Sequence, residues 1–420
     1  MLWLVVGYMF LFIFRPYEYW TILADLRIER LYMLGLMVLV FVSTRKRYIP
    51  HRINAVVLGF FAIMLLSAVT AYNTDAAFDV TFNYFKLLVF YFIVILTIED
   101  EEQLKLFITA YIGVMFIYIG KSAWEFFVHD RYEWRMGIKR MTGIDQTYND
   151  PNAFAASIVY SFPFAWALIR YRLESVWQRR GLWAYSLLGL ICIMYTGSRS
   201  GMATVILFMG LVWLYSSRKG AGMIALAVIL AVSWNFMPDD LQNRFETIYN
   251  PEAGPSNAAA SAQGRMAGFE QGLKLFGEYP ILGIGPGNFK FGWHDGRGMN
   301  AHNLYGQVMG EFGVTGTTAF ALFLLTTFLN SRNNIARIKA LEMAAGNRSE
   351  PDEPGADNPA DRNLLLLQLL SVASIQVMPL MLFKGWADHN LYRYNWLWIG
   401  AVTVLVSHFV AEREAHRETV

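Results

Sequence analysis

The chain has 420 residues, 55% of them hydrophobic, with only 35 Lys and Arg and 33 Asp and Glu. A charged content of 16% excludes an ordinary soluble protein, in which about a quarter of the residues are charged. The net charge of +2 gives no electrostatic basis for a nucleic-acid partner, and the single cysteine, Cys192, excludes a disulfide framework. We therefore expect an integral membrane protein.

Apolar runs predict about twelve transmembrane helices in one all-α, polytopic domain that spans residues 1–420, since a spanning helix needs roughly 20 apolar residues. The runs cover residues 1–14, 31–42, 55–72, 81–98, 104–120, 152–169, 181–197, 201–215, 220–237, 303–329, 364–383 and 391–410. No basic segment precedes the first run and no small-residue cleavage site follows it. We therefore expect a retained helix rather than a signal peptide.

The distribution of basic residues predicts that both termini lie in the cytoplasm. In that orientation the inner loops hold most of the positive charge, as the positive-inside rule requires. The residues concerned are Arg45, Lys46, Arg47, Arg52, Arg170, Arg172, Arg179, Arg180, Arg218 and Lys219. The outer loop after the fifth run opposes this orientation, because it contains Lys121, Arg131, Arg135, Lys139 and Arg140.

Two segments stand apart from the predicted bundle. Residues 332–362 form an inner loop whose Pro- and Asp-rich part is expected to be disordered. Residues 238–302 form a long outer loop, in which we expect a short helix near 239–249, a hinge at 251–261 and an amphipathic helix at 262–279. Met266, Phe269, Leu273 and Phe276 would share one face of that helix. A loop this long is usually functional, so we expect it to carry part of the site.

Ionisable residues within or beside spans are functional candidates, because a bilayer penalises buried charge. Lys86, Glu311 and Lys384 lie within predicted spans. The outer face collects a larger group, consisting of Arg199, Arg265, His302, Asp388 and His389. This group predicts a polar site that faces outward.

Arg199 lies in the tight turn Thr196-Gly-Ser-Arg-Ser-Gly201 between two predicted spans. Its glycines permit close backbone approach, and Ser198, Ser200 and the free amides could hold an anion such as phosphate. An interfacial arginine that extends toward the lipid headgroups is the alternative interpretation.

Arg265 is expected to begin the amphipathic helix, where an anion would be bound favourably by the helix N-terminus and the guanidinium. The alternative is an exposed loop charge. The sequence Gly283-Ile-Gly-Pro-Gly-Asn-Phe289 lacks the third glycine and the βαβ unit of a dinucleotide site, so it predicts a rigid turn.

His302 lies where the long loop returns to the bilayer, and a neutral imidazole there can act as a general base toward a hydroxyl. A structural histidine next to a capping Asn303 is the alternative. Asp150 and Asn152, at an outer helix start, could bind a sugar or simply cap the helix.

Three motifs together resemble the O-antigen ligase/polymerase superfamily. They are the Thr196–Gly201 turn, Arg265 followed by Tyr279-Pro-Ile-Leu-Gly-Ile-Gly-Pro-Gly-Asn-Phe289, and Ala301-His-Asn303 with Glu311-Phe-Gly313. The likeness extends from about residue 149 to 329. Arg15-Pro-Tyr-Glu18 is also similar to N-terminal segments of that family.

The resemblance implies an inverting glycosyltransferase of GT-C-like architecture in the bacterial inner membrane, with its active site facing the periplasm. The donor would be a glycan on undecaprenyl diphosphate, with no metal and no other cofactor. Arg199 and Arg265 would bind the diphosphate and His302 would activate the acceptor hydroxyl. The predicted substrate-binding residues are Ser198, Ser200, Asp150, Asn152, Asn303 and His389, the last without a firm counterpart in the family.

The acceptor separates the activities within this superfamily. We expect a ligase of lipopolysaccharide biosynthesis that transfers the glycan to lipid A-core, with a polymerase that extends a growing lipid-linked glycan as the alternative. A protein O-oligosaccharyltransferase is a third possibility. A transporter would place its ionisable residues near the midplane in two related halves, which the sequence does not show.

Overall fold

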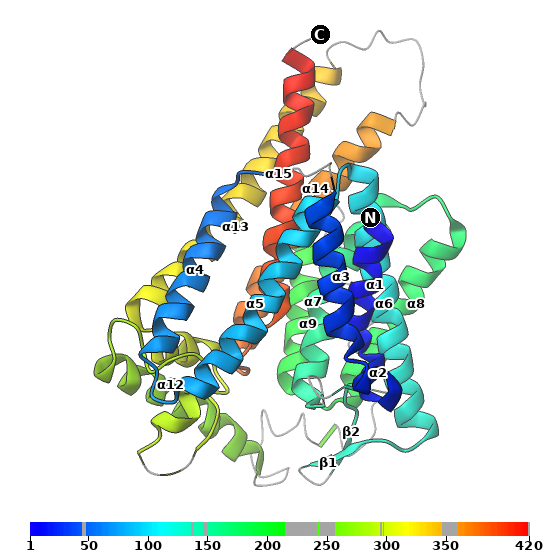
Figure 1. The fold of residues 1–420 in the computed structure, drawn as a ribbon. Coiled ribbons are helices and arrows are strands. Elements are labelled where there is room, and N and C mark those ends of the chain that lie inside the picture. Colours follow the sequence, from blue (N-terminus) through cyan, green and yellow to red (C-terminus); the bar gives the residue numbers. More distant parts are fainter. Residues whose placement is uncertain are drawn as a thin grey trace.

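The computed structural model describes residues 1–43, 48–135, 138–145, 149–214, 235, 242–243, 257–294, 296, 298–346 and 359–418. The regular structure of this part of the chain is mostly helical, which agrees with the predicted all-α membrane protein (Figure 1). A hairpin of β1 (Glu133–Arg135) and β2 (Ile138–Arg140) lies in the outer loop after the fifth run, where no strand is predicted from the sequence.

The helices follow the predicted order along the chain. They are α1 (Leu2–Phe14), η1 (Pro16–Glu18), α2 (Thr21–Asp25), α3 (Ile28–Val42), α4 (Arg52–Val69), α5 (Thr74–Thr97), α6 (Glu101–Val128), α7 (Pro151–Tyr171), α8 (Val176–Tyr195), α9 (Arg199–Leu214), α12 (Asn257–Glu278), η3 (Phe289–Gly292), α13 (Leu304–Gly346), α14 (Pro359–Gly385) and α15 (Tyr394–Glu418). Eleven of the twelve predicted runs coincide with these helices, and residues 220–237 lie outside the described ranges.

Seven of the described helices are long and apolar enough to cross a membrane: α4, α5, α6, α7, α13, α14 and α15. The helix α9 is apolar but shorter. The centre of the bundle consists of α7 and α15, since 83% of each apolar stretch is buried inside the protein. The total of twelve spans therefore stays a prediction.

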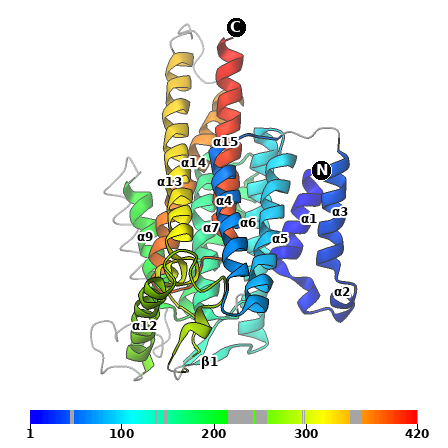
Figure 2. The ribbon, with the colours of Figure 1, turned by 60° about the vertical axis from the view of Figure 1, so that its left-hand side comes forward.

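Both termini lie on one side of the bundle, and α12 and the β hairpin lie on the opposite side (Figures 1 and 2). The helix α13 continues past its apolar stretch, so residues 332–346, predicted to belong to an inner loop, are helical and that loop is shorter than expected. The Pro- and Asp-rich part that is predicted to be disordered falls mainly on residues 347–358, which lie outside the described part.

The long outer loop differs from its prediction in where its helix begins. The helix α12 begins at Asn257 instead of near residue 262, so Arg265 lies in its third turn and not at its N-terminus. The dipole argument for Arg265 was therefore wrong. The predicted apolar residues lie on this one helix, where Met266 and Leu273 are exposed and Phe269 and Leu273 line a groove. The predicted short helix near 239–249 lies almost wholly outside the described residues.

Glycines determine how α12 packs. A Cβ on Gly268 would lie 1.8 Å from the carbonyl oxygen of Ala301, and one on Gly272 would lie 2.4 Å from Gly306. The buried residues of α12 are Gly268, Gln271, Gly272 and Leu275, and the two glycines let the backbone of α12 approach the start of α13. This close approach positions Arg265, one turn before Gly268, beside the segment that contains His302.

The predicted rigid turn at Gly283–Phe289 is present. Gly283, Gly285 and Gly287 all have positive φ, and the amides of Ile284 and Gly285 donate to the carbonyl oxygens of Gly310 and Glu311 at 2.9 and 3.1 Å. These bonds attach the outer loop to α13 near its break at Gly313, where φ is 59°. The outer loop therefore contacts α13 in two places, through α12 at the start of α13 and through this turn near Gly310 and Glu311.

Candidate functional site

The turn before α9 has the geometry that its sequence predicts. The helix α8 ends at Tyr195, Gly197 adopts a φ of 57°, and α9 begins at Arg199. The Ser198 hydroxyl donates to Asn152 Oδ1 at 2.8 Å and accepts from the amide of Gly201 at 3.1 Å. Ser198 is buried, so it shapes the turn and links it to α7.

A buried arginine supports this turn from behind. Arg140, at the end of β2, is 1% exposed and donates through Nε to the carbonyl oxygen of Thr196 at 2.7 Å. Its Nη2 donates to Asn152 Oδ1 at 3.4 Å. The sequence identifies Arg140 only as a loop charge, because its burial is a property of the folded hairpin.

Asp150 caps α7, because its Oδ1 accepts from the amides of Asn152 and Ala153 at 2.8 and 3.0 Å. Of the two roles that the sequence left open for Asp150, helix capping is the one that these bonds support. Asn152 bonds Ser198 and Arg140. Substrate binding by these two residues stays a prediction.

Lys384 adds a second cation beneath the turn. It is 0% exposed, and its Nζ donates to the Ser200 hydroxyl at 2.8 Å. The predicted anion-binding serine is therefore held by a buried lysine at the end of α14. The sequence identifies Lys384 only as an ionisable residue within a span, because the two residues are 184 positions apart and their contact forms only in the folded bundle.

His302 and His389 come together although they lie on different segments. Their ring centroids are 5.2 Å apart and the rings are nearly perpendicular. His302 has a φ of 46°, and Asn303 rather than His302 caps α13, since Asn303 Oδ1 accepts from the amide of Gly306 at 3.0 Å. Asn303 also donates to the carbonyl oxygen of Trp386 at 3.2 Å, which holds the His389 segment against α13.

The segment after α14 has two buried ionisable groups. Burial alone would raise the pKa of Asp388, but Lys384, Arg393 and His389 outweigh it and lower that pKa. Burial lowers the pKa of His389, against the opposing effect of Asp388. At neutral pH His389 is therefore mainly neutral beside a charged Asp388, and its Nδ1 is 3.8 Å from Asp388 Oδ1.

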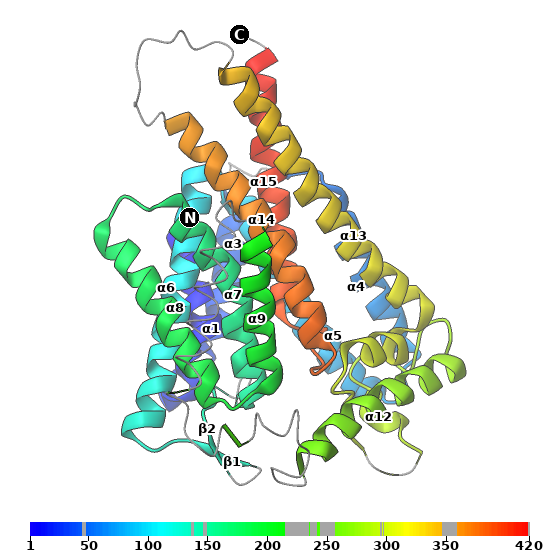
Figure 3. The same cartoon turned by 180° about the vertical axis from the view of Figure 1, so that it is seen from behind.

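Arg265 lies in the same electrostatic neighbourhood. Burial lowers its pKa first, and Arg199 lowers it further, while Asp388 and Asp150 oppose both effects. Two arginines that repel each other across a partly buried space are the arrangement expected around a bound dianion. Arg199 and Arg265 thus lie near each other, as do His302 and His389, and Asp388, next to His389, interacts with Arg265. Figure 3 shows the helices that carry or adjoin these residues, α9, α12, α13 and α14, with α12 on the side opposite the C-terminus.

A groove of about 980 Å³ begins at the two arginines. Arg199, Ser200 and Arg265 line its polar end, and apolar side chains of α9, α12, α13 and α14 line the rest. These include Ala203, Phe269, Leu273, Val308, Phe320 and Leu324. Along α13 the lining residues extend from Leu304 to Leu324, on both sides of the break at Gly313. This groove would fit a ligand that has a polar head and a long apolar tail.

In the described residues, no group of three or more His, Cys, Asp or Glu side chains is placed to hold a metal ion. Glu311 is buried, but it accepts from the Tyr392 hydroxyl and from the amide of Gly287, the latter at 3.0 Å. It therefore fixes the glycine turn to the segment before α15. Its bonds give it a structural role at one side of the site.

Residues 184–321 match the family model described as O-antigen ligase. The matched segment contains Arg199, Arg265 and His302, and it confirms the resemblance to the O-antigen ligase/polymerase superfamily. The match covers about a third of the chain, and it supports an enzyme of the membrane glycosyltransferase-like ligase and polymerase type. No curated protein matches the chain.

The O-antigen ligase match ends before α14. Asp150, Asn152, Lys384 and His389 therefore lie outside it, and only the fold brings them to the matched residues. Their assignment rests on the contacts described above.

Gly268 tests whether the placement of Arg265 matters. Gly268→Ala should lower stability by about 1–3 kcal/mol and reduce glycan transfer, because its Cβ would clash with Ala301 and displace α12. Gly277→Ala on the same helix is the matched control, since a Cβ there meets nothing within 4 Å. Melting temperature and transfer rate would be measured for both. Equal behaviour of the two variants would show that the close approach is dispensable.

Proposed function

We propose that the protein transfers a glycan from undecaprenyl diphosphate to a hydroxyl of lipid A-core. The groove that begins at Arg199 and Arg265 is the observation that carries this proposal. Its apolar length suits a prenyl chain, and its polar end suits a diphosphate bound by two guanidinium groups. The chemistry requires no metal, and a GT-C-like architecture is part of the same proposal.

The reaction is a displacement at the anomeric carbon of the donor sugar. The acceptor oxygen forms a bond to that carbon, and the bond between the carbon and the diphosphate oxygen breaks, so the diphosphate leaves with the electron pair. Arg199 and Arg265 stabilise the charge that develops on the leaving oxygens. Attack from the face opposite the leaving group inverts the configuration.

His302 takes the acceptor proton in this mechanism. It directly precedes the residue that caps α13, and Leu304, two positions later, lines the groove. A general base must lie within hydrogen-bond reach of the hydroxyl while the donor is bound. His389 lies at the edge of the His302 ring and, being mainly neutral, does not repel the imidazolium that forms.

The site would face the periplasm and the termini would lie in the cytoplasm. This orientation places Arg52, Arg170, Arg172, Arg179 and Arg180 on the inner side of the bacterial inner membrane. Cysteine substitutions at exposed Lys274 and Lys339 test it, because Cys192 is buried. An impermeant thiol reagent added outside intact inner membranes should label Lys274→Cys but not Lys339→Cys, and the opposite result would reverse the orientation.

Purified protein supplied with the lipid-linked glycan tests the proposed function. Transfer should require lipid A-core and should continue in EDTA. Products elongated on undecaprenyl diphosphate without lipid A-core would instead establish a polymerase. No transfer to either acceptor would contradict the proposal.

A further inference from the structure

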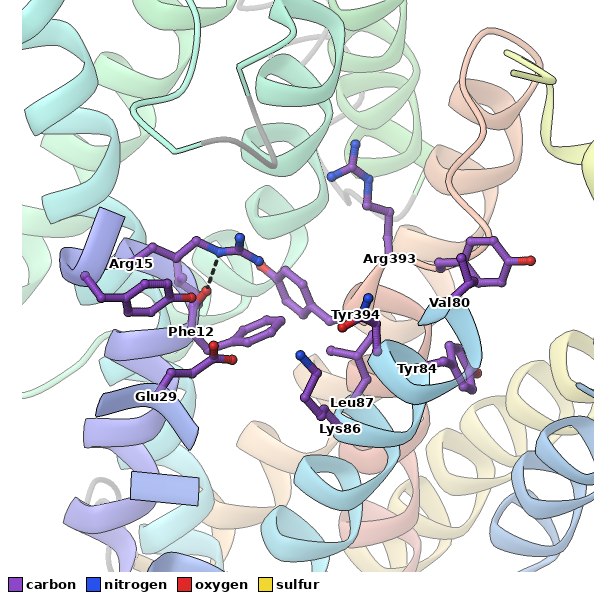
Figure 4. A pocket seen from close by; sticks show the side chains of 13 residues that line it. Phe12, Arg15, Glu29, Val80, Tyr84, Lys86, Leu87, Arg393 and Tyr394 are labelled. Atoms are coloured by element: carbon purple, nitrogen blue, oxygen red, sulfur yellow. Dashed lines mark hydrogen bonds between the residues drawn. The ribbon is translucent and has the colours of Figure 1, made fainter. Parts of the chain in front are cut away.

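A second cavity of about 500 Å³ lies between α1, α3 and α5 and the start of α15. Figure 4 shows Arg15 and Glu29 on one side of it and Lys86, Tyr394 and Arg393 on the other. It lies in the outer half of the bundle, since Arg15 follows α1 and Arg393 directly precedes α15. It is separate from the donor groove, with which it shares no lining residue.

The cavity carries a positive charge. Three cations line it, Arg15, Lys86 and Arg393, together with the carboxylate of Glu29. Arg15 is paired outside the cavity, because its Nη1 donates to Glu18 Oε1 at 3.1 Å and its Nε lies 3.8 Å from Asp145 Oδ2. Lys86 and Arg393 against Glu29 then give a formal balance of two minus one, or +1. The wall also contains apolar rings, including Phe12 and Tyr84.

Lys86 is the most informative of these cations. It lies within the spanning helix α5, and in the part of the chain that the structure describes no carboxylate lies within ion-pair distance of its Nζ. Its described neighbour is the ring of Phe82, 5.7 Å away. A cation within a span is costly unless it has a partner, so its presence beside a cavity indicates an anionic ligand.

The two cavities flank one short segment. Trp386 and Ala387 line the donor groove, and Tyr392, Arg393 and Tyr394 line the second cavity, with His389 between them in the chain. The five residue steps from Ala387 to Tyr392 span about 18 Å at most. A lipid held in the second cavity could therefore present its sugar to the two histidines while the donor occupies the groove.

We infer that the second cavity binds a phosphate group on the head of the acceptor lipid. This inference rests on the proposed function and names the acceptor as a phosphate-bearing lipid. Ammonium and guanidinium groups bind phosphate oxygens through charge-assisted hydrogen bonds, and the apolar rings contact the adjoining lipid. The phosphate could belong to lipid A or to the diphosphate of a growing lipid-linked glycan.

Binding to the full-length protein in phosphatidylcholine nanodiscs tests this inference. The probes are phosphorylated lipid A, its dephosphorylated counterpart and undecaprenyl diphosphate. Lys86→Gln should weaken binding of the phosphorylated acceptor about tenfold, as expected for one lost charged hydrogen bond. Lys274→Gln, an exposed lysine on α12 that lines neither cavity, is the matched control and should not change it.

The two phosphate sources are distinguished by measuring the binding of undecaprenyl diphosphate to the Arg265→Gln protein, in which binding in the donor groove is weakened. Loss of lipid A binding in Lys86→Gln supports a ligase acceptor, and loss of the residual undecaprenyl diphosphate binding supports a growing glycan. Unchanged affinity for both probes, or equal binding of dephosphorylated lipid A, would overturn the inference. Undecaprenyl diphosphate binding that Arg265→Gln leaves unchanged would instead contradict the proposed donor site.

Discussion

His302→Gln should reduce glycan transfer by about a hundredfold or more while donor binding and melting temperature remain close to those of the parent. Glutamine keeps hydrogen-bonding capacity but cannot accept the acceptor proton at neutral pH. The caps of α13 would be retained, because Asn303 rather than His302 makes the capping bond. The measurement is single-turnover transfer with the donor bound in advance.

His294→Gln provides the matched control for this substitution. His294 is an exposed histidine of the same outer loop, and its Nε2 contacts Glu278 at 3.2 Å. Its replacement should leave transfer unchanged. A His302→Gln protein that transfers glycan at nearly the parental rate would remove His302 from proton transfer, and His389, 5.2 Å away between ring centroids, would then be tested as the base.

Arg199→Lys and Arg265→Lys should each lower transfer by about ten- to a hundredfold although they keep the positive charge. A guanidinium binds two phosphate oxygens at once, whereas an ammonium acts as a point charge, and one lost charged hydrogen bond costs about 1.5–3 kcal/mol. The loss should include weaker binding of undecaprenyl diphosphate, measured directly on the purified protein.

Arg27→Lys is the control, because Arg27 is exposed between α2 and α3 and lines neither cavity. It should behave like the parent. Full activity in both Arg199→Lys and Arg265→Lys would show that a two-pronged contact with a diphosphate is not needed at these positions.

The local features of the site could be predicted from the sequence because each depends on neighbouring residues. The turn at Arg199 follows from two glycines between apolar runs, and the rigid turn at Gly283–Phe289 follows from its glycines and proline. The apolar run that begins at residue 303 predicts a helix there, and His302 does lie just before the start of α13.

The remaining features depend on contacts between distant segments. The buried face of α12 depends on how closely Gly268 and Gly272 approach the start of α13. The spacing of large apolar side chains along the sequence cannot predict such an approach. The bonds of Lys384 with Ser200 and of Arg140 with Thr196 likewise require the folded bundle. Lys86 was recognised as an ionisable residue within a span, but its cavity was not.

The proposed function depends on the donor diphosphate binding between Arg199 and Arg265. Cryo-electron microscopy of the protein in nanodiscs with undecaprenyl diphosphate would locate that diphosphate. We expect density for the diphosphate in contact with both guanidinium groups and for the prenyl chain along the groove lined by Phe269, Val308 and Leu324. Diphosphate density at any other place, with the groove between α9, α12 and α13 unchanged, would contradict the proposed function.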